Sequence, residues 1–270
     1  MAKAVILLAV YNAEKYLEEC LSSITAQTYQ DWELFACNDG SSDSSLSILE
    51  RFAVRESRIH IHCNERNMGI TATRNRLIGL IPDDAEYVAW VDSDDVCFSE
   101  RIQRQIEFLE QHPQVGAVGS ALEIIDEQSQ TVGSRHYPEH PDEIRQKLPM
   151  NNVIAQPALM LRSCVIKTTG LYSFDYPVCE DYDYWLRVLE NYDFANIREP
   201  LLRYRISTTQ TKQSRLKETL RLTLQIQRNY YCRSNGKMPL RGILYQIAGN
   251  MLIALPANWI LKLFTMVTYK

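Results

Sequence analysis

Short apolar runs and longer amphipathic stretches alternate along the first part of the chain. The short runs are rich in β-branched residues and have the length of strands, at 4–10, 33–37, 58–63 and 86–92. The longer stretches have the apolar spacing of helices, at 14–27, 43–55, 71–80 and 98–111. Alternating strand and helix signals predict an α/β fold in which helices flank a mostly parallel central sheet.

The pattern changes after residue 112. VGAVGSALEII at 115–125 is a long apolar run, and ALMLR at 158–162 has strand character. EDYDYWLRVLEN at 180–191 predicts a helix with Glu180 and Asp181 at its start and an apolar face beyond them. We expect this half to shape a second pocket beside the one formed by the parallel strands.

The charges are divided unevenly along the 270 residues. Residues 1–200 hold 17 Lys and Arg against 32 Asp and Glu, whereas 201–270 hold 12 against one. An acidic body repels nucleic acid, so we expect no nucleic-acid partner. The basic end instead indicates an anionic surface, such as a membrane. The alternative is that the basic end folds back onto the acidic body.

Residues 242–261 contain no charged side chain and lie between Arg241 and Lys262. That length is sufficient to cross a bilayer. Polar residues and a proline interrupt the segment, at Gln246, Asn250, Pro256 and Asn258. Three arrangements therefore remain open: a span, a helix lying in the membrane interface, and a buried hairpin that covers the catalytic body or a dimer partner.

The N-terminal run MAKAVILLAVYN leads directly into a polar motif without a small-residue cleavage site, and does not indicate a signal peptide. The seven cysteines are scattered and never form a C-x-x-C pair, which favours reduced thiols over disulfides or a zinc site. We expect a cytoplasmic protein, with peripheral contact to the cytosolic face of the membrane.

Three carboxylates follow the apolar run EYVAWV, on Asp92, Asp94 and Asp95, with Ser93 between the first two. Carboxylates this close repel one another unless a cation lies among them. A Mn²⁺ or Mg²⁺ ion held by one or two protein oxygens keeps open positions for a diphosphate. The alternative is an acidic turn that caps the following helix.

Two further polar segments lie near strand ends or helix starts. In Asn38–Asp43 (NDGSSD), Asp39 can accept a hydrogen bond from a nucleobase imide, although an ordinary strand-to-helix turn has the same composition. Asn67-x-Gly69 precedes a helix that carries Arg74, and a guanidinium beside a helix N-terminus suits a diphosphate. The alternative for Arg74 is a solvated surface position.

In combination and order, these motifs resemble those of the family 2 glycosyltransferases, inverting enzymes with a GT-A fold. The matching motifs are Val10-Tyr11-Asn12, Asn38-Asp39-Gly40-Ser41-x-Asp43, Asn67-x-Gly69 with Arg74-Asn75, Asp92-x-Asp94-Asp95, and Glu180-Asp181 with Trp185-Leu186-Arg187. The resemblance covers residues 3–206. It implies a catalytic domain at 1–206, with a nucleotide-sugar-binding half at 1–112 and an acceptor-binding half at 113–206. A basic, then apolar, helical extension would follow at 207–270.

The resemblance also implies residue roles. Tyr11 would pack on the base, Asp39 would bind its imide, and Asp92 would contact the ribose. Asp94 would bind Mn²⁺ or Mg²⁺ between the two phosphates, and Asp181 would be the general base, with Glu180 positioning it or the acceptor. Further contacts to the nucleotide sugar would come from Ala9, Asn12, Asn67, Gly69, Arg74 and Ser93. Without the other motifs, Glu180 and Asp181 would be read as helix-capping acids.

This sequence departs from the family pattern at three places. Ala9-Val10 stand where a proline-containing stretch is usual, Gln156-Pro157 replace a frequent His-Pro, and Ser207 stands where a histidine is often found. The metal would then depend on Asp94 and phosphate oxygens, without help from a histidine.

The resemblance favours a UDP-sugar donor and a saccharide or lipid-linked acceptor, in the synthesis of a cell-surface polysaccharide or glycolipid. Three other functions remain open at this point: a polyprenyl-phosphate glycosyltransferase, a non-catalytic nucleotide-sugar-binding protein, and a phosphatase of the haloacid-dehalogenase type. In the last, Asp92 would be a nucleophile.

Overall fold

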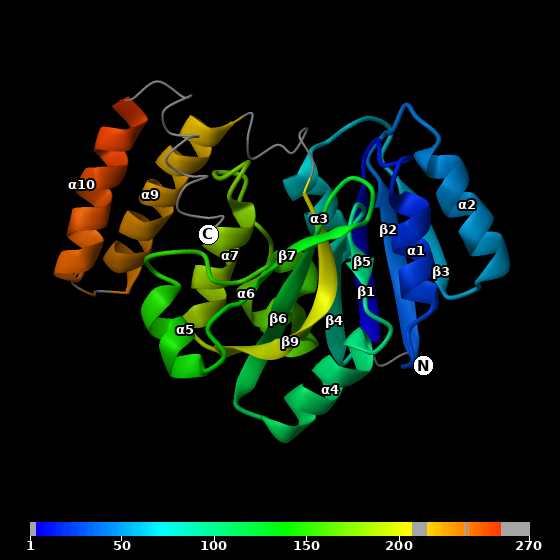
Figure 1. The fold of residues 1–270 in the computed structure, drawn as a ribbon, viewed down its shortest axis with the longest axis horizontal. Helices are drawn as coiled ribbons and strands as arrows, with labels where there is room; N and C mark the ends of the chain where they lie inside the picture. Colours follow the sequence, from blue (N-terminus) through cyan, green and yellow to red (C-terminus); the bar gives the residue numbers. More distant parts are fainter. Residues whose placement is uncertain (1–3, 207–214, 235, 237, 255–270) are drawn as a thin grey trace.

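The computed structural model describes residues 4–206, 215–234, 236 and 238–254, and its centre is a nine-stranded sheet (Figure 1). Eight strands follow in the order β3-β2-β1-β4-β8-β6-β9-β5, and β7 pairs with β6. The strands are β1 (Ala4–Val10), β2 (Trp32–Asn38), β3 (Ile59–Cys63), β4 (Tyr87–Asp92), β5 (Val96–Cys97), β6 (Val115–Ile125), β7 (Thr131–Arg135), β8 (Met160–Arg162) and β9 (Asp193–Arg205). The helices of the body are α1 (Leu17–Thr25), α2 (Ser45–Arg55), α3 (Ile70–Ile78), α4 (Arg101–Gln111), α5 (Pro141–Lys147), α6 (Ser163–Thr169), α7 (Glu180–Leu189) and the short 3-10 helix η1 (Gln156–Ala158).

Strands β1 to β4 form the parallel half that the apolar periodicity predicts. β1 lies between β2 and β4 and pairs in parallel with both, and β3 pairs in parallel with β2. Alternate side chains of β1 enter two different cores: Ile6 and Leu8 pack with α1, α2 and α4, whereas Val5 and Leu7 pack with α3, α6 and α7. This division follows from the two-residue period of a strand, and both faces of the sheet are covered by helices.

The second half of the sheet is mixed. β8 is antiparallel to both β4 and β6, β6 and β9 are parallel, and the two-residue strand β5 is antiparallel to β9. Because β5 follows Asp95 directly, α4 begins at Arg101 and not near residue 98. The pairing of β5 with β9 brings the Asp92–Asp95 turn beside the end of β9, more than a hundred residues away in the chain.

Two C-terminal helices, α9 (Leu216–Arg233) and α10 (Leu240–Ala254), form a hairpin beside α7 (Figure 1). Arg233 forms ion pairs with Asp183 of α7 at 3.6 Å and with Glu190 at 3.5 Å. Part of the basic end therefore folds back onto the acidic body, the alternative left open by the charge distribution.

Among the described residues, no helix has the length and apolarity that crossing a bilayer requires. Ser207 and residues 255–270, which include Pro256 and Asn258, lie outside the described part of the chain.

Candidate functional site

The loops after β1 and β2 are joined by side-chain hydrogen bonds. The backbone N–H of Asn12 donates to Ser41 Oγ at 3.0 Å, and Asn12 Oδ1 accepts from the backbone N–H of Ser42 at 2.9 Å. Asn12 has a positive φ of 47°, which asparagine tolerates better than most residues. Tyr11, next to it, is 49% exposed. The joined loops thus hold an aromatic ring accessible at the carboxyl end of the sheet, where α/β proteins bind ligands.

Asp39 anchors the loop that leads into α3. Its Oδ1 accepts from Asn64 Nδ2 at 2.7 Å and from the backbone N–H of Met68 at 2.8 Å, and its Oδ2 accepts from the backbone N–H of Gly69 at 3.0 Å. Asn67 Oδ1 also accepts from that Gly69 N–H at 2.9 Å. Asp39 is buried and fixes the residues at the start of α3, and Oδ2, for which one hydrogen bond is seen, has a second lone pair that can accept another.

Two glycines allow this close packing. Gly40 has a φ of 67°, and a Cβ there would lie 2.5 Å from the backbone of Arg66. Gly69 has a φ of 86° immediately before α3, with open space where a side chain would start. Both positions need glycine for its left-handed backbone conformation, and Gly40 also for the contact distance.

The Asp92–Asp95 turn gathers three carboxylates at the end of β4. Asp92 and Asp94 are partly exposed, and Asp95 is buried. Burial and the neighbouring Asp92 carboxylate raise the pKa of Asp94 to about 6, against a smaller opposing effect of Arg205. Burial and the two other carboxylates raise the pKa of Asp95 well above its usual value, and Asp95 Oδ2 has no hydrogen-bond partner among the described residues.

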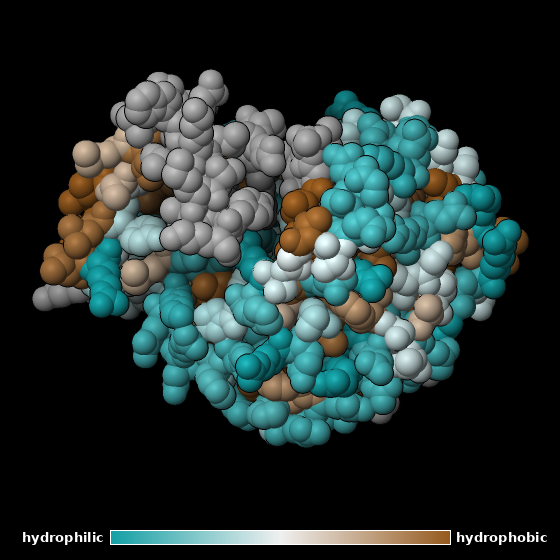
Figure 2. Space-filling model, viewed as in Figure 1, coloured by the Kyte–Doolittle hydropathy of each residue, from teal (hydrophilic) through white to brown (hydrophobic). Residues whose placement is uncertain are grey.

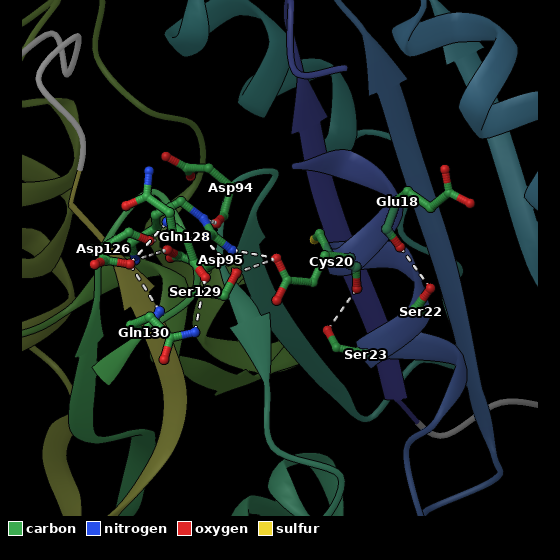
Figure 3. Close-up of polar contacts among 12 residues, drawn as sticks. Glu18, Cys20, Ser22, Ser23, Asp94, Asp95, Asp126, Gln128, Ser129 and Gln130 are labelled. Atoms are coloured by element: carbon green, nitrogen blue, oxygen red, sulfur yellow. Dashed lines mark hydrogen bonds and ion pairs between the residues drawn. The ribbon is translucent and has the colours of Figure 1, made fainter. Parts of the chain in front are cut away.

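Arg205, at the end of β9, holds the back of this turn. Its backbone N–H donates to Asp95 Oδ1 at 2.9 Å, and its Nε donates to the backbone carbonyl of Asp94 at 2.8 Å. Its guanidinium, fully buried, also donates to Ser129 Oγ at 2.9 Å and to Glu19 Oε2 at 2.6 Å. Figure 3 shows Asp94 and Asp95 beside the turn that carries Ser129. The acidic turn is thus held by a cation that the motif analysis did not identify.

Arg74 links the acidic turn to the start of α7. Its Nη1 donates to Glu180 Oε1, and its Nη2 lies 3.3 Å from Asp92 Oδ1. Arg74 is buried, so it is not the solvated surface residue that the sequence left open. Burial lowers the pKa of the Arg74 guanidinium, but Glu180 and Asp92 outweigh that effect and raise it overall. Burial raises the pKa of Glu180 to about 7, although Arg74 opposes this rise.

Asp181 follows Glu180 in the first turn of α7 and is only partly buried. Its Oδ2 lies 3.4 Å from Asn152 Nδ2, and its Oδ1 accepts from the backbone N–H of Tyr182 at 2.8 Å. The two neighbouring acids therefore differ: Glu180 is paired inside the protein, whereas Asp181 keeps contact with solvent. Gln156, in the place of the usual histidine of the His-Pro pair, is buried with its Nε2 3.5 Å from Tyr172 Oη.

A divalent cation fits the acidic turn in one respect. Asp94 carries a carboxylate destabilised by burial and by Asp92, and a cation would relieve both effects. Within the described residues, however, no three His, Cys, Asp or Glu side chains lie close enough together to hold a metal ion themselves. A metal at Asp94 would thus need ligands from a bound molecule, as oxygen-preferring cations with few protein ligands do.

Several glycosyltransferases align with most of this chain. The profile of glycosyl transferase family 2 matches residues 5–168. An uncharacterized glycosyltransferase of Haemophilus influenzae is 34% identical over 76% of this chain and 66% of its own length. The Escherichia coli enzyme WfgD, a UDP-Glc:alpha-D-GlcNAc-diphosphoundecaprenol beta-1,3-glucosyltransferase, is 29% identical over 80% of this chain and 82% of its own. The chain thus spans slightly less than two thirds of the Haemophilus relative.

Solved structures share the fold. Staphylococcus aureus TarS 1–349, in complex with UDP-GlcNAc, matches with a TM-score of 0.63 and 18% identity over 96% of this chain and 83% of that chain. The mannosyltransferase PcManGT from Pyrobaculum calidifontis, in complex with GDP-Man and Mn²⁺, matches with a TM-score of 0.61 and 15% identity over 96% and 72%. The predicted GT-A fold is confirmed. The family match also excludes the phosphatase alternative, and this chain belongs to glycosyltransferase family 2.

Proposed function

We propose that this protein is an inverting glycosyltransferase that moves a sugar from a nucleotide-diphosphate sugar to an acceptor hydroxyl. The observation that carries the proposal is the convergence of two acidic groups from distant parts of the chain. Arg74 contacts Asp92, beside Asp94, and also Glu180, beside Asp181. A transferase of this type needs one acidic group at the leaving diphosphate and one base at the acceptor.

On the donor side, we assign Tyr11 to the base and Asp39 to its imide N–H, through the remaining capacity of Oδ2. Asp92 would accept from the ribose while Arg74 holds its carboxylate in place. A Mn²⁺ or Mg²⁺ ion held by Asp94 and by the donor would neutralise the leaving diphosphate. UDP is the nucleotide we favour, because WfgD acts on UDP-Glc and TarS was solved with UDP-GlcNAc. GDP stays the alternative, because PcManGT was solved with GDP-Man.

On the acceptor side, we assign the general base to Asp181 and a positioning role to Glu180. Asp181 is partly exposed and can reach an acceptor hydroxyl, whereas Glu180 is buried against Arg74. Asp181 would take the proton of that hydroxyl as its oxygen attacks the anomeric carbon, and the nucleoside diphosphate would leave from the opposite face. Inversion in one displacement needs no enzyme nucleophile.

The acceptor we favour is a lipid-linked saccharide in the synthesis of a cell-surface polysaccharide. The E. coli relative acts on such an acceptor according to its name, and the basic end of this chain suits an anionic membrane. A polyprenyl phosphate as the direct acceptor, or nucleotide-sugar binding without transfer, are the two remaining alternatives.

Calorimetric titration tests the donor site. UDP, dTDP and GDP would be titrated into the wild type, Asp94→Asn and Asp84→Asn, each with Mn²⁺ and with chelator. Asp84 is an exposed acid just before β4 and controls for the loss of one negative charge. Metal-dependent binding of one nucleotide that only Asp94→Asn loses would support the proposal. No binding of any nucleotide would refute it.

Transfer assays test the acceptor side. With a donor that binds, Asp181→Asn should lower kcat by about a hundredfold to ten-thousandfold, because it removes a general base. Nucleotide affinity should not change. Asp175→Asn, an exposed acid in the loop before α7, is the matched control. Nucleotide binding without turnover in the wild type, over a panel of lipid-linked and free saccharides, would instead support the non-catalytic alternative.

A further inference from the structure

Helix α10 packs on the protein through its small and polar residues. Gly242, Gln246 and Gly249 are its buried positions and form one stripe, because they are four and three residues apart. A Cβ on Gly249 would lie 2.9 Å from Leu224 of α9, so the two helices approach closely. Gln246 Nε2 donates to the carbonyl of Leu224 and to Gln227 Oε1, both at 3.0 Å. The polar side chain of this stripe is therefore turned inward.

Four large apolar residues of α10 lie on the opposite side, whereas Leu252 and Ile253 near its end are partly buried. Leu240, Leu244, Ile247 and Met251 repeat at intervals of four and three residues, and together with Ile243 and Tyr245 they are between 45% and 73% exposed. Figure 2 shows hydrophobic surface at the left edge of the molecule, where Figure 1 places α10. A helix on a water-soluble body normally has the reverse arrangement, with its apolar stripe inward. Small residues at the helix contact and large apolar residues outside are instead typical of helices that face lipid.

Basic side chains gather on the neighbouring helix α9. Lys217, Arg221, Leu224 and Arg228 share one face of α9, because they are four, three and four residues apart. Since Leu224 packs on Gly249, the three basic side chains lie along the contact with α10. They are exposed, and α10 itself begins with exposed Arg241 and contains no acidic residue. This arrangement complements anionic lipid headgroups, whereas a second copy of the chain would bring like charges together.

We propose that α10 docks this protein on an anionic bilayer, with Leu240, Leu244, Ile247 and Met251 entering the interface and the basic face of α9 meeting the headgroups. The helix would lie in the plane of the interface, because the described helices are too short or too polar to cross it. This surface is separate from the residues assigned to transfer. The proposed function enters only as the reason why the enzyme would be at a membrane. It would bring α7, which packs on α9, to the membrane side of the molecule.

Flotation of the full-length protein with vesicles tests this surface. We expect binding to vesicles that contain phosphatidylglycerol, weaker binding to phosphatidylcholine alone, and loss of the difference at high salt. Leu244→Gln/Ile247→Gln should weaken binding at least about tenfold, because two apolar side chains no longer enter the interface. Val54→Gln/Val132→Gln, at two exposed valines outside the hairpin, is the matched control and should bind as the wild type does. Arg221→Gln/Arg228→Gln should weaken binding only to the anionic vesicles.

Three results would overturn the inference. The first is unchanged vesicle binding in Leu244→Gln/Ile247→Gln. The second is a concentration-dependent dimer in sedimentation velocity that this double variant abolishes, without any binding of the wild type to vesicles. The third is vesicle binding lost on deletion of 255–270 but kept in the double variant. Thermal melting and nucleotide binding of each variant give independent readouts, so a failure of the proposed transferase activity would leave the vesicle result interpretable.

Discussion

Replacing Arg74 by methionine would remove the guanidinium that lies between Asp92 and Glu180 and leave the buried Glu180 without its cation. Arg74 and Glu180 are 7% and 6% exposed, and removal of one member of such a pair costs about 3–5 kcal/mol of unfolding free energy. The contact with Asp92 adds on the order of 0.5 kcal/mol, because the Asp92 side chain is 37% exposed and its charge is screened by water.

The loss of unfolding free energy in Arg74→Met should depend on pH, because Glu180 is no longer a buried charge once it binds a proton. Burial raises the pKa of Glu180 from 4.5 to about 7 in the folded protein even with Arg74 present. Between these values the folded state binds more protons at this position than the unfolded state, so this group's contribution to stability falls as pH rises. Loss of Arg74 raises the pKa of Glu180 further. Arg74→Met should therefore cost most above pH 7 and clearly less near pH 5.

Urea unfolding followed by tryptophan fluorescence at pH 5 and pH 8 measures these differences. Arg76→Met is the control, because Arg76 lies on the same helix but is exposed and donates to the Cys63 carbonyl at 2.8 Å. It should cost at most about 1 kcal/mol at either pH. Adding Glu180→Gln to Arg74→Met should recover stability at pH 8, because the buried charge is gone. A cost of Arg74→Met below about 1 kcal/mol at both pH values, or no recovery in the double variant, would refute the reasoning.

Three further outcomes follow from the site. Arg205→Met should destabilise the fold by about 3–5 kcal/mol in urea unfolding, because a buried cation and its bonds to the acidic turn are lost; a cost below about 1 kcal/mol would contradict this. Mn²⁺-dependent nucleotide binding should weaken as pH falls through about 6, because burial raises the pKa of Asp94 to about that value and a proton then competes with the metal. Calorimetry at pH 5 and pH 7.5 would measure the two affinities. Equal affinities would count against Asp94 as a metal ligand. Gln227→Leu should lower kcat while leaving nucleotide affinity unchanged. Gln227 Nε2 donates to the carbonyl of Met150 at 2.7 Å, close in the chain to Asn152, whose side chain contacts Asp181. Steady-state kinetics would measure kcat and calorimetry the affinity, and a general loss of fold would lower both quantities.

The parallel half of the fold could be predicted because its central strands β1 and β4 are almost entirely buried and its strands alternate with amphipathic helices. β1 is apolar throughout and coincides with the predicted run 4–10, and β4 is apolar up to Asp92 and begins one residue after the predicted run 86–92. β7 has no such signal, because all five of its residues are exposed. Its pairing with β6 and the strand order of the second half depend on long-range contacts that local periodicity does not contain.

The polar motifs of the site could be found from their positions after strands, but their partners could not. Arg74 was expected near a nucleotide because of its helix. Its buried partner Glu180 lies 106 residues away, and no local pattern joins the two. Arg205 ends an Arg-Tyr-Arg sequence, and the family pattern marks position 207 after it but not Arg205 itself. Its partner Glu19 lies 186 residues away. For α10, the apolar residues were visible in the sequence, but the side they face was not.

The position of Arg74 has a consequence for the proposed mechanism. If Asp92 contacts the ribose, then the residue that orients it also fixes Glu180 at the start of the helix that carries Asp181. Donor binding and the placement of the base would then share one buried guanidinium, and a donor that moved Asp92 would change the forces on Glu180. Lysine could not replace arginine here, because its one ammonium nitrogen lacks the planar fork through which Nη1 and Nη2 of Arg74 reach Glu180 and Asp92 separately. Arg74→Lys should therefore lose more kcat than nucleotide affinity, whereas a purely donor-binding role would lower affinity first.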